Sequence, residues 1–199
     1  DYMDFFEEIG AEYTVLKVNS QEGSDFNHNL IENSIEVSNK PVIIIGHSYG
    51  GLYGLSTLIH NEKLWSKVRG FVAIQTPFHG SKIAETIYNN RLLKFFATNI
   101  LLFFGGSERG LYEITQERAN NRWNEWGEHV ERLAKVIPII VVASKIQKNK
   151  LHQMFWQESE DTDGLIESES SFLPNEHIYW ALVDGWHHID TIGYPYDRW

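Results

Sequence analysis

The sequence predicts a protein of the α/β class, in which a mostly parallel sheet is flanked by helices. Three apolar, β-branched runs at residues 42–45, 70–75 and 137–143 have the near-continuous hydrophobic pattern of strands buried inside such a sheet. Stretches with apolar residues at helical spacing lie between them, and strands that alternate with helices form parallel sheets. We therefore expect these strands to lie in one sheet that is covered by helices on both faces.

The residues before the first of these runs predict two helices and a further strand. Residues 2–9 have apolar positions at helical spacing, and Gly10 ends that helix. Residues 13–18 have the β-branched pattern of a strand. The Ser-, Gly-, Asp- and Asn-rich residues 19–27 predict a loop, and a helix follows at about 27–38.

The second half of the chain is expected to add helices and a last strand. A helix that follows the strand at 42–45 should run to about residue 60. The pattern from residue 81 to 127 is helical and rich in aromatic residues. Polar residues 157–171 predict a loop, and residues 178–183 predict the final strand. With no internal repeat and no linker, we expect residues 1–199 to form a single domain, in which residues 82–127 are a helical cap or lid region.

The composition excludes several classes of function. The formal charge of −10 argues against nucleic acid as a partner, because phosphate binding needs clustered Lys and Arg. The absence of cysteine excludes disulfides, thiolate metal sites and a cysteine nucleophile. The longest apolar stretch, residues 92–104, is interrupted by Lys94 and Asn99, so we expect no transmembrane segment.

The run at 42–45 passes directly into the pattern G-x-S-x-G, centred on Ser48, and then into a helical pattern. This strand–turn–helix context predicts a nucleophile elbow, a sharp turn that exposes a serine hydroxyl. The strained backbone of such a turn requires close neighbours without a Cβ, which the glycines supply. At the start of the helix, the backbone N–H of Tyr49 would face an oxyanion.

A serine nucleophile needs a histidine base and usually an acid that orients it. Asp163 and His188 lie late in the chain, and a glycine that permits a tight turn follows Asp163. The order Ser, Asp, His is the one found in proteins with this type of serine turn. Spacing alone leaves other choices open. The competing acids and bases are Asp161, Glu167, Asp184, His187, His177 and His79.

Several motifs together resemble the bacterial secreted true lipases of the Pseudomonas and Burkholderia type, within the α/β-hydrolase superfamily. The motifs are G-H-S-x-G-G at 46–51, T-P-F-H-G-S at 76–81, L-Y-E-I-T at 111–115 with W-N at 123–124, D-G-L-I at 163–166 with S-S at 170–171, and H-I-D at 188–190. The resemblance implies Ser48 as nucleophile, Asp163 as acid and His188 as base.

The chain departs from this family at its calcium site. Asp190 corresponds to a calcium ligand, but the glutamine expected four residues later is Tyr194, and the upstream aspartate position falls near Ala143 and Ser144. We therefore expect no calcium site, no other metal and no organic cofactor, and interpret Asp190 as a local hydrogen-bond partner.

A second departure concerns the N-terminus. The family begins with a strand that ends in a His-Gly loop, and that loop supplies the second N–H of the oxyanion hole. This sequence starts one helix later. The strand and the second donor either lie in an N-terminal segment missing from this chain, as we expect, or are absent from the protein. Loss of one such donor costs about 3–4 kcal/mol, or roughly 10²–10³ in rate.

Apolar side chains in the region 82–127 suggest an acyl-binding function, although a pair of core helices would show the same pattern. Phe103 and Phe104, together with Phe78 near the end of a strand, are our candidates for substrate binding. Glycines at 105, 106 and 110 would allow hinge motion of a lid. We expect His79 and His47 to have structural rather than catalytic functions.

These features predict a serine carboxylic-ester hydrolase, namely a lipase or long-chain esterase that acts on a lipid or other ester. Whether it contacts a lipid interface stays open. An acyltransferase or thioesterase would use the same residues. A catalytically silent, lipid-binding module of the same fold is an alternative from another class. Only the resemblance suggests secretion, so the compartment stays open.

Overall fold

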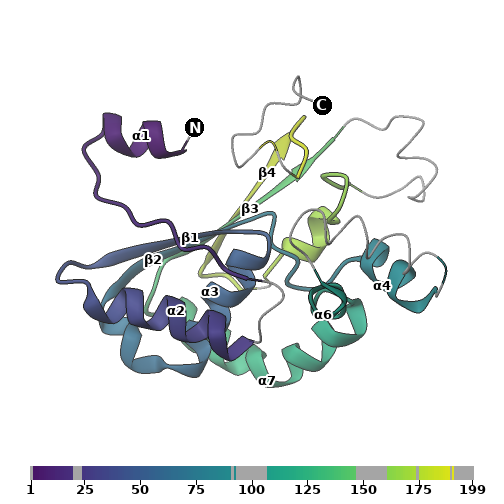
Figure 1. The fold of residues 1–199 in the computed structure, drawn as a ribbon, viewed down its shortest axis with the longest axis horizontal. Coiled ribbons are helices and arrows are strands. Elements are labelled where there is room, and N and C mark those ends of the chain that lie inside the picture. Colours follow the sequence, from purple (N-terminus) through teal and green to yellow (C-terminus); the bar gives the residue numbers. More distant parts are fainter. Residues whose placement is uncertain are drawn as a thin grey trace.

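The computed structural model describes residues 2–19, 24–90, 92, 107–146, 161–173, 175–188 and 190. Four strands form one sheet in the order β1-β2-β3-β4, and every neighbouring pair is parallel (Figure 1). The strands are β1 (Val42–His47), β2 (Val68–Ile74), β3 (Ile139–Lys145) and β4 (Ile178–Asp184). The predicted α/β class and the strands near residues 42, 70, 137 and 178 are confirmed.

Helices precede and connect the strands. They are α1 (Tyr2–Glu8), α2 (Ser24–Val37), α3 (Tyr49–His60), α4 (Lys82–Asn89), α6 (Glu108–Glu113) and α7 (Gln116–Ala134), with 3₁₀ turns η1 (Glu62–Ser66) and η2 (Ser168–Ser171). Helices α2, α3 and α7 lie together on one face of the sheet (Figure 1). Helix α3 connects β1 to β2, and α7 leads into β3.

The hydrophobic core fills the space between the sheet and these helices. Leu55 and Leu58 of α3 are fully buried, as are Phe71 of β2 and Leu133 of α7. Gly54 allows α3 to approach the sheet, because a Cβ there would lie 3.0 Å from the Phe71 ring. Each fully buried side chain of this size contributes about 1.5–3 kcal/mol, so this layer holds the strand that precedes Ser48 in place.

Side chains on the opposite face of the sheet are exposed within the described ranges, so helices on that face stay a prediction. Ile43 and Ile45 of β1 are 64% and 46% exposed, and Tyr179 of β4 is 70% exposed. The strand order gives a physical reason for this exposure. Each crossover is expected to be right-handed, and strands added successively in one direction then place all connecting segments on the same face.

Residues 13–18, which the sequence predicts as a strand, are extended chain outside the sheet. Strand β1 is an edge strand of the described sheet, but this segment does not pair with it. Instead, Leu16 and Val18 pack against the core while Val15 is 61% exposed. Asn27 closes the connection to α2, since its side chain bonds both the N–H and the carbonyl of Asn19, at 2.8 and 2.9 Å. The alternating pattern here reflects one-sided packing without a ladder.

The region 82–127, expected to be a cap or lid, is helical where it is described. Its last helix, α7, continues to Ala134, and Trp126 and Val130 belong to the core cluster. The lid function of this region stays a prediction, and Phe103 and Phe104 lie outside the described residues. Within the described ranges, no helix is long and apolar enough to cross a bilayer.

Candidate active site

Ser48 occupies a strained turn between β1 and α3. Its backbone has φ 51° and ψ −121°, a conformation that non-glycine residues rarely adopt. The Ser48 N–H donates to the carbonyl of Ile74 at the end of β2, at 2.9 Å, which ties the turn to the neighbouring strand. The nucleophile elbow predicted from G-x-S-x-G therefore has the expected geometry. Tyr49 is the first residue of α3, where backbone N–H groups lack an intrahelical acceptor.

Two glycines around Ser48 are required by close packing, but a third is not. A Cβ on Gly46 would lie 2.5 Å from the Gly51 nitrogen, and a Cβ on Gly51 would lie 1.9 Å from Thr76 Oγ1. At Gly50, the second glycine of the pentapeptide, a Cβ would meet nothing within 4 Å. On the helix side of Ser48, packing therefore requires a glycine at position 51, one residue beyond the G-x-S-x-G pattern.

The structure brings Ser48, His188 and Asp163 into one hydrogen-bonded chain. His188 Nε2 lies 3.0 Å from Ser48 Oγ, and His188 Nδ1 lies 2.8 Å from Asp163 Oδ2. Because a carboxylate only accepts, Nδ1 carries the proton and Nε2 is free to accept from the Ser48 hydroxyl. Such a base, oriented by a buried acid, can deprotonate a serine hydroxyl as it attacks.

Asp163 is held rigidly for this contact. It is 2% exposed, and its second oxygen, Oδ1, accepts from the N–H groups of Leu165 and Ile166 at 2.9 and 2.8 Å. Gly164, which lies between Asp163 and Leu165, has φ +100°, so the Asp-Gly pair forms a turn that the Asp163 carboxylate closes. The Asp163 carbonyl also accepts from the N–H of His188 at 3.0 Å, so the two loops are joined by backbone and side chain.

The other candidate acids and bases are engaged elsewhere. Asp161 and Asp184 are exposed and pair with Lys145, each at 3.4 Å. Glu167 accepts from the Lys82 N–H at 2.9 Å. His177 is exposed beside Glu176. For His187 the contact is that of the backbone, whose N–H donates to Asp190 Oδ2 at 2.8 Å, while Ser48 Oγ contacts the ring of His188.

Sequence reasoning missed the residues that hold the His188 loop. Three consecutive carbonyls of this loop each accept from a side chain at the carboxyl end of a different strand. Trp186 accepts from Ser144 Oγ at 2.9 Å, His187 from Gln75 Nε2 at 3.2 Å, and His188 from His47 Nε2 at 2.8 Å. The available signal was polar residues at the ends of otherwise apolar strands, where sites of α/β sheets form.

His47 and Gln75 also bind each other. His47 Nε2 lies 3.1 Å from Gln75 Oε1, and Gln75, fully buried with φ 47°, donates to Ser144 Oγ as well. The His47 and His188 rings lie 4.7 Å apart. Burial, together with the neighbouring His188, lowers the pKa of His47 to about 4, so His47 stays neutral and donates at neutral pH. His47 is therefore a positioning residue for the histidine above Ser48.

The T-P-F-H-G-S segment, residues 76–81, contacts helix α7 and the loop that carries Asp163. His79 stacks on Trp123 at 4.9 Å, and its Nε2 donates to the Phe172 carbonyl at 2.9 Å. Ser81 caps α4 and donates to the Leu165 carbonyl at 2.9 Å. Phe78 is fully buried in the core, and the Trp123 indole donates to its carbonyl at 2.8 Å. A contribution of Phe78 to substrate binding stays a prediction.

Among the described residues at the position expected for calcium, Asp190 supplies a carboxylate. Ala143 and Ser144 are buried in β3 without a carboxylate, and Ser144 Oγ is engaged with Gln75 and the Trp186 carbonyl. Asp190 Oδ2 accepts from the local N–H of His187, and its Oδ1 is buried without a hydrogen-bond partner among the described residues. We therefore derive no step through calcium. In the ranges that the structure describes, no group of three or more His, Asp or Glu side chains could hold a metal.

The arrangement of strands and helices is similar to that of known ester hydrolases. It matches the mature lipase BlEst2 of Bacillus licheniformis with a TM-score of 0.67 and 19% identity, over 86% of this chain and 69% of that one. The chain has the α/β-hydrolase fold. A metagenomic carboxyl esterase matches at a TM-score of 0.71 and 18% identity, over 92% of this chain and 56% of that one. The phospholipase PlaB of Legionella pneumophila matches at 0.59 and 12%, over 86% of this chain and 40% of that one.

A family model described as the PGAP1-like alpha/beta domain matches residues 3–100, from α1 to the end of α4 and beyond. No curated protein sequence matches the chain. The chain spans little more than half of the esterase and two fifths of the phospholipase, and identities below 20% establish the fold alone. The closer assignment to Pseudomonas- and Burkholderia-type lipases stays a prediction.

The two glycines after Ser48 form a matched pair for testing the elbow. Gly51→Ala should destabilise the protein by about 1–3 kcal/mol, because the new methyl overlaps Thr76, whose Cβ also lies only 2.9 Å away. Gly50→Ala should change stability by less than about 1 kcal/mol. Urea unfolding of both variants measures this, and equal stabilities would contradict the packing described for Gly51.

The lowered pKa of His47 predicts a pH-dependent stability. The unfolded chain protonates this histidine near pH 6.5 and the folded protein only near 4, so folding stability is lost as the pH falls through that window. The loss from this group should reach about 2 kcal/mol at pH 5. His47→Gln, which keeps a donor for the His188 carbonyl, should lose correspondingly less between pH 7 and 5 in thermal unfolding. Parallel pH profiles for the two proteins would refute this assignment.

Proposed function

We propose that this chain is a serine carboxylic-ester hydrolase that acts through an acyl-enzyme on Ser48. The observation that carries the proposal is the continuous hydrogen-bonded chain from Asp163 through His188 to the hydroxyl of the strained Ser48 turn. Similarity in fold to lipases and esterases supports the same reaction class. Ser48 is partly exposed, so a substrate carbonyl can reach its hydroxyl.

In the proposed first step, Ser48 Oγ attacks the ester carbonyl carbon while His188 Nε2 takes the hydroxyl proton. Asp163 keeps the imidazole oriented and stabilises the imidazolium through Nδ1. The oxyanion of the tetrahedral intermediate accepts a hydrogen bond from the backbone N–H of Tyr49, at the start of α3. A second donor would come from the N-terminal segment that the lipase resemblance implies.

Collapse of this intermediate breaks the bond to the leaving alcohol, which takes the proton from His188. Water then attacks the acyl-enzyme with His188 again as base, and the carboxylic acid leaves as Ser48 recovers its proton. The ester supplies the acyl group and the leaving alcohol, and one water molecule balances the second half-reaction.

For substrate, we propose an ester with a long acyl chain, presented from a lipid or an interface. The support is the resemblance to secreted lipases and the apolar sequence between α4 and α6, which contains Phe103 and Phe104. We propose that residues 82–127 cap the site.

Substitutions in the hydrogen-bonded chain test the reaction. Ser48→Ala should lower ester hydrolysis by about 10⁴–10⁶ and abolish covalent labelling by a fluorophosphonate. Asp163→Asn should lower kcat by about 10⁴, because it favours the wrong histidine tautomer. Asp161→Asn is the matched control: this exposed acid pairs only with Lys145 among described residues, so turnover should be unchanged.

Three results would contradict the proposal. Wild-type turnover in Ser48→Ala, or labelling at another serine, would exclude Ser48 as nucleophile. A folded, full-length protein that neither labels nor hydrolyses esters would favour a silent binding module.

A chain-length series of p-nitrophenyl esters, assayed on the full-length protein, tests the substrate class. Each methylene buried is worth about 0.8 kcal/mol, so kcat/KM should rise by up to about fourfold per methylene until the groove is filled. Activity should also increase at a lipid–water interface. A maximum at two to four carbons, without a response to the interface, would identify a small-ester hydrolase instead.

A further inference from the structure

The backbone of Gln75 is strained at the point where the chain leaves β2. Its φ is 47°, and Ser48 is the one other non-glycine residue with a positive φ in the described ranges. Such conformations are uncommon outside glycine, persist only where neighbouring contacts hold them, and gather at functional sites. The Gln75 N–H donates to the Val142 carbonyl of β3 at 2.7 Å, so this residue is tied to the next strand, as Ser48 is. The strain indicates that the position of the Gln75 side chain matters.

The side chain of Gln75 is fully buried and hydrogen-bonded at both ends of its amide. Oε1 lies 3.1 Å from His47 Nε2. Nε2 donates to Ser144 Oγ and, at 3.2 Å, to the His187 carbonyl. The reverse orientation of the amide would place Oε1 against that carbonyl, so these partners fix which end accepts and which end donates.

The hydrogen bonds on either side of Gln75 run in one direction. His47 Nε2 faces two acceptors, Gln75 Oε1 and the His188 carbonyl at 2.8 Å, so it carries a proton and donates. Gln75 donates in turn to Ser144, and Ser144 Oγ donates to the Trp186 carbonyl at 2.9 Å. Each of the three side chains thus donates to one carbonyl of the His188 loop, while His47 and Gln75 also donate to the next side chain.

A glutamine fits the middle of this series because the position needs an acceptor and two donors. The acceptor serves His47, and the donors serve Ser144 and the His187 carbonyl. An ionised glutamate has no donor, and a methionine has neither donor of the amide. Without the amide, buried groups on both sides would lose a partner, which is costly in a protein interior. The loop would then shift until these groups found other partners.

We propose that Gln75 is a positioning residue for the reaction proposed for Ser48. Through this series of hydrogen bonds it holds the backbone that carries His188, and so maintains the 3.0 Å between His188 Nε2 and Ser48 Oγ. Asp163 holds the same residue through its ring and its N–H. The inference rests on the proposed function, since the distance matters for proton transfer from the serine hydroxyl.

Gln75→Met, which keeps the length of the side chain but removes the amide, tests the proposal. We expect kcat for a p-nitrophenyl ester to fall about 10- to 100-fold while KM changes by less than about twofold. The reason is that a displaced base slows proton transfer without altering how the ester binds. Wild-type kcat in this variant, or a raised KM with kcat unchanged, would overturn the proposal.

Thr57→Val is the matched control for the loss of a buried polar group. Thr57 is 1% exposed, and its Oγ1 donates to the Tyr53 carbonyl within α3 at 2.8 Å, without a contact to the His188 loop among the hydrogen bonds of the described residues. This variant should keep the wild-type kcat even where its stability falls. An equal loss of kcat in Thr57→Val and Gln75→Met would reduce Gln75 to a general contribution to stability.

Proton NMR separates this inference from the proposed function, because it needs no turnover. The low-field resonance of the His188 Nδ1–H, assigned by its loss in His188→Gln, should move or disappear in Gln75→Met and stay in Thr57→Val. An unchanged resonance in Gln75→Met would refute the positioning even in an active enzyme. Should Gln75→Met not fold, Ser144→Ala removes only the last link and should lower kcat about three- to tenfold at unchanged KM. Wild-type kcat in Ser144→Ala would then overturn the proposal.

Discussion

The site depends on a clamp that joins three strand ends to one loop. The carbonyls of residues 186, 187 and 188 accept from Ser144, Gln75 and His47, which follow or end β3, β2 and β1. Backbone carbonyls are strong acceptors that cost free energy when buried without a donor. A loop with all three satisfied has little freedom to move. This constraint acts together with the two hydrogen bonds between His188 and Asp163 to set the His188 ring between Asp163 and Ser48.

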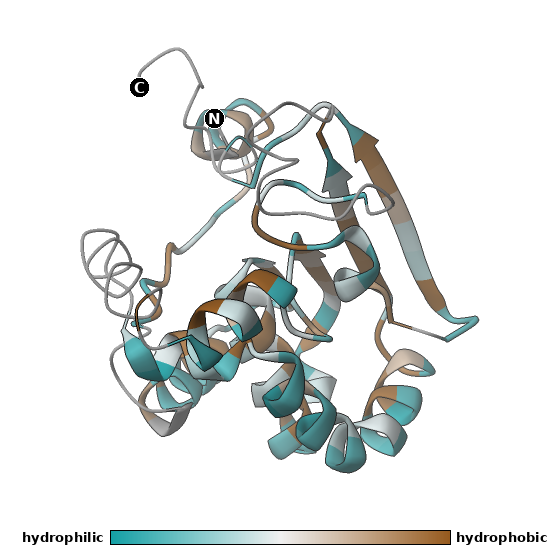
Figure 2. Cartoon of the chain, turned by 90° about the vertical axis from the view of Figure 1, so that its right-hand side faces the viewer, coloured by the Kyte–Doolittle hydropathy of each residue, from teal (hydrophilic) through white to brown (hydrophobic). Residues whose placement is uncertain are grey.

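Strand order explains why the clamp can form. In a parallel sheet, all carboxyl ends lie at the same edge, so residues far apart in sequence meet there. The order β1-β2-β3-β4 also places the connecting helices α3 and α7 on one face, leaving isoleucines of β1 exposed on the other. Figure 2 shows hydrophobic residues, in brown, along the strands. The topology that assembles the site is thus the same one that leaves the β1 isoleucines exposed.

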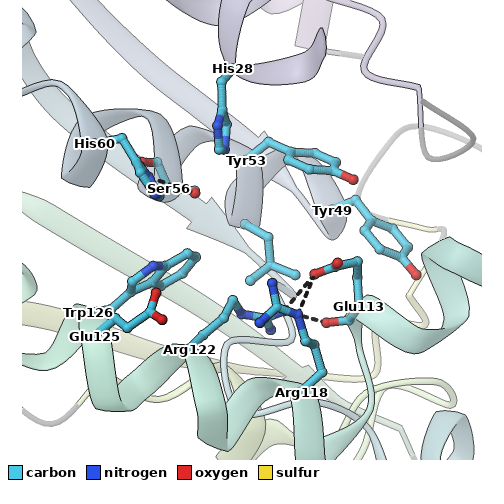
Figure 3. A pocket seen from close by; sticks show the side chains of 11 residues that line it. His28, Tyr49, Tyr53, Ser56, His60, Glu113, Arg118, Arg122, Glu125 and Trp126 are labelled. Atoms are coloured by element: carbon cyan, nitrogen blue, oxygen red, sulfur yellow. Dashed lines mark hydrogen bonds and ion pairs between the residues drawn. The ribbon is translucent and has the colours of Figure 1, made fainter. Parts of the chain in front are cut away.

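Helix α3 contributes to two separate environments. Its first turn carries the strain at Ser48 and offers N–H groups at the edge of the sheet, while its side chains from Tyr49 to His60 line a cavity that residues of α6 and α7 also line (Figure 3). The core residues Leu55 and Leu58 lie on another side of the same helix and bury it against β1 and β2. Rigid packing of one helix therefore supports both the reactive serine and one wall of this cavity.

The sequence by itself determined the α/β class, the strand–turn–helix at Ser48 and the order of Ser, Asp and His, because these features are written in local spacing. Resemblance then singled out Asp163 and His188 among several acids and bases. The local pattern of residues 13–18 wrongly predicted a strand, because no neighbouring strand pairs with this segment. Only the tertiary structure decided the clamp, the need for Gly51 rather than Gly50, and the hydrogen bonds at both ends of the Gln75 amide. Those contacts join positions as far as 141 residues apart, and no local periodicity encodes which distant groups the sheet brings together.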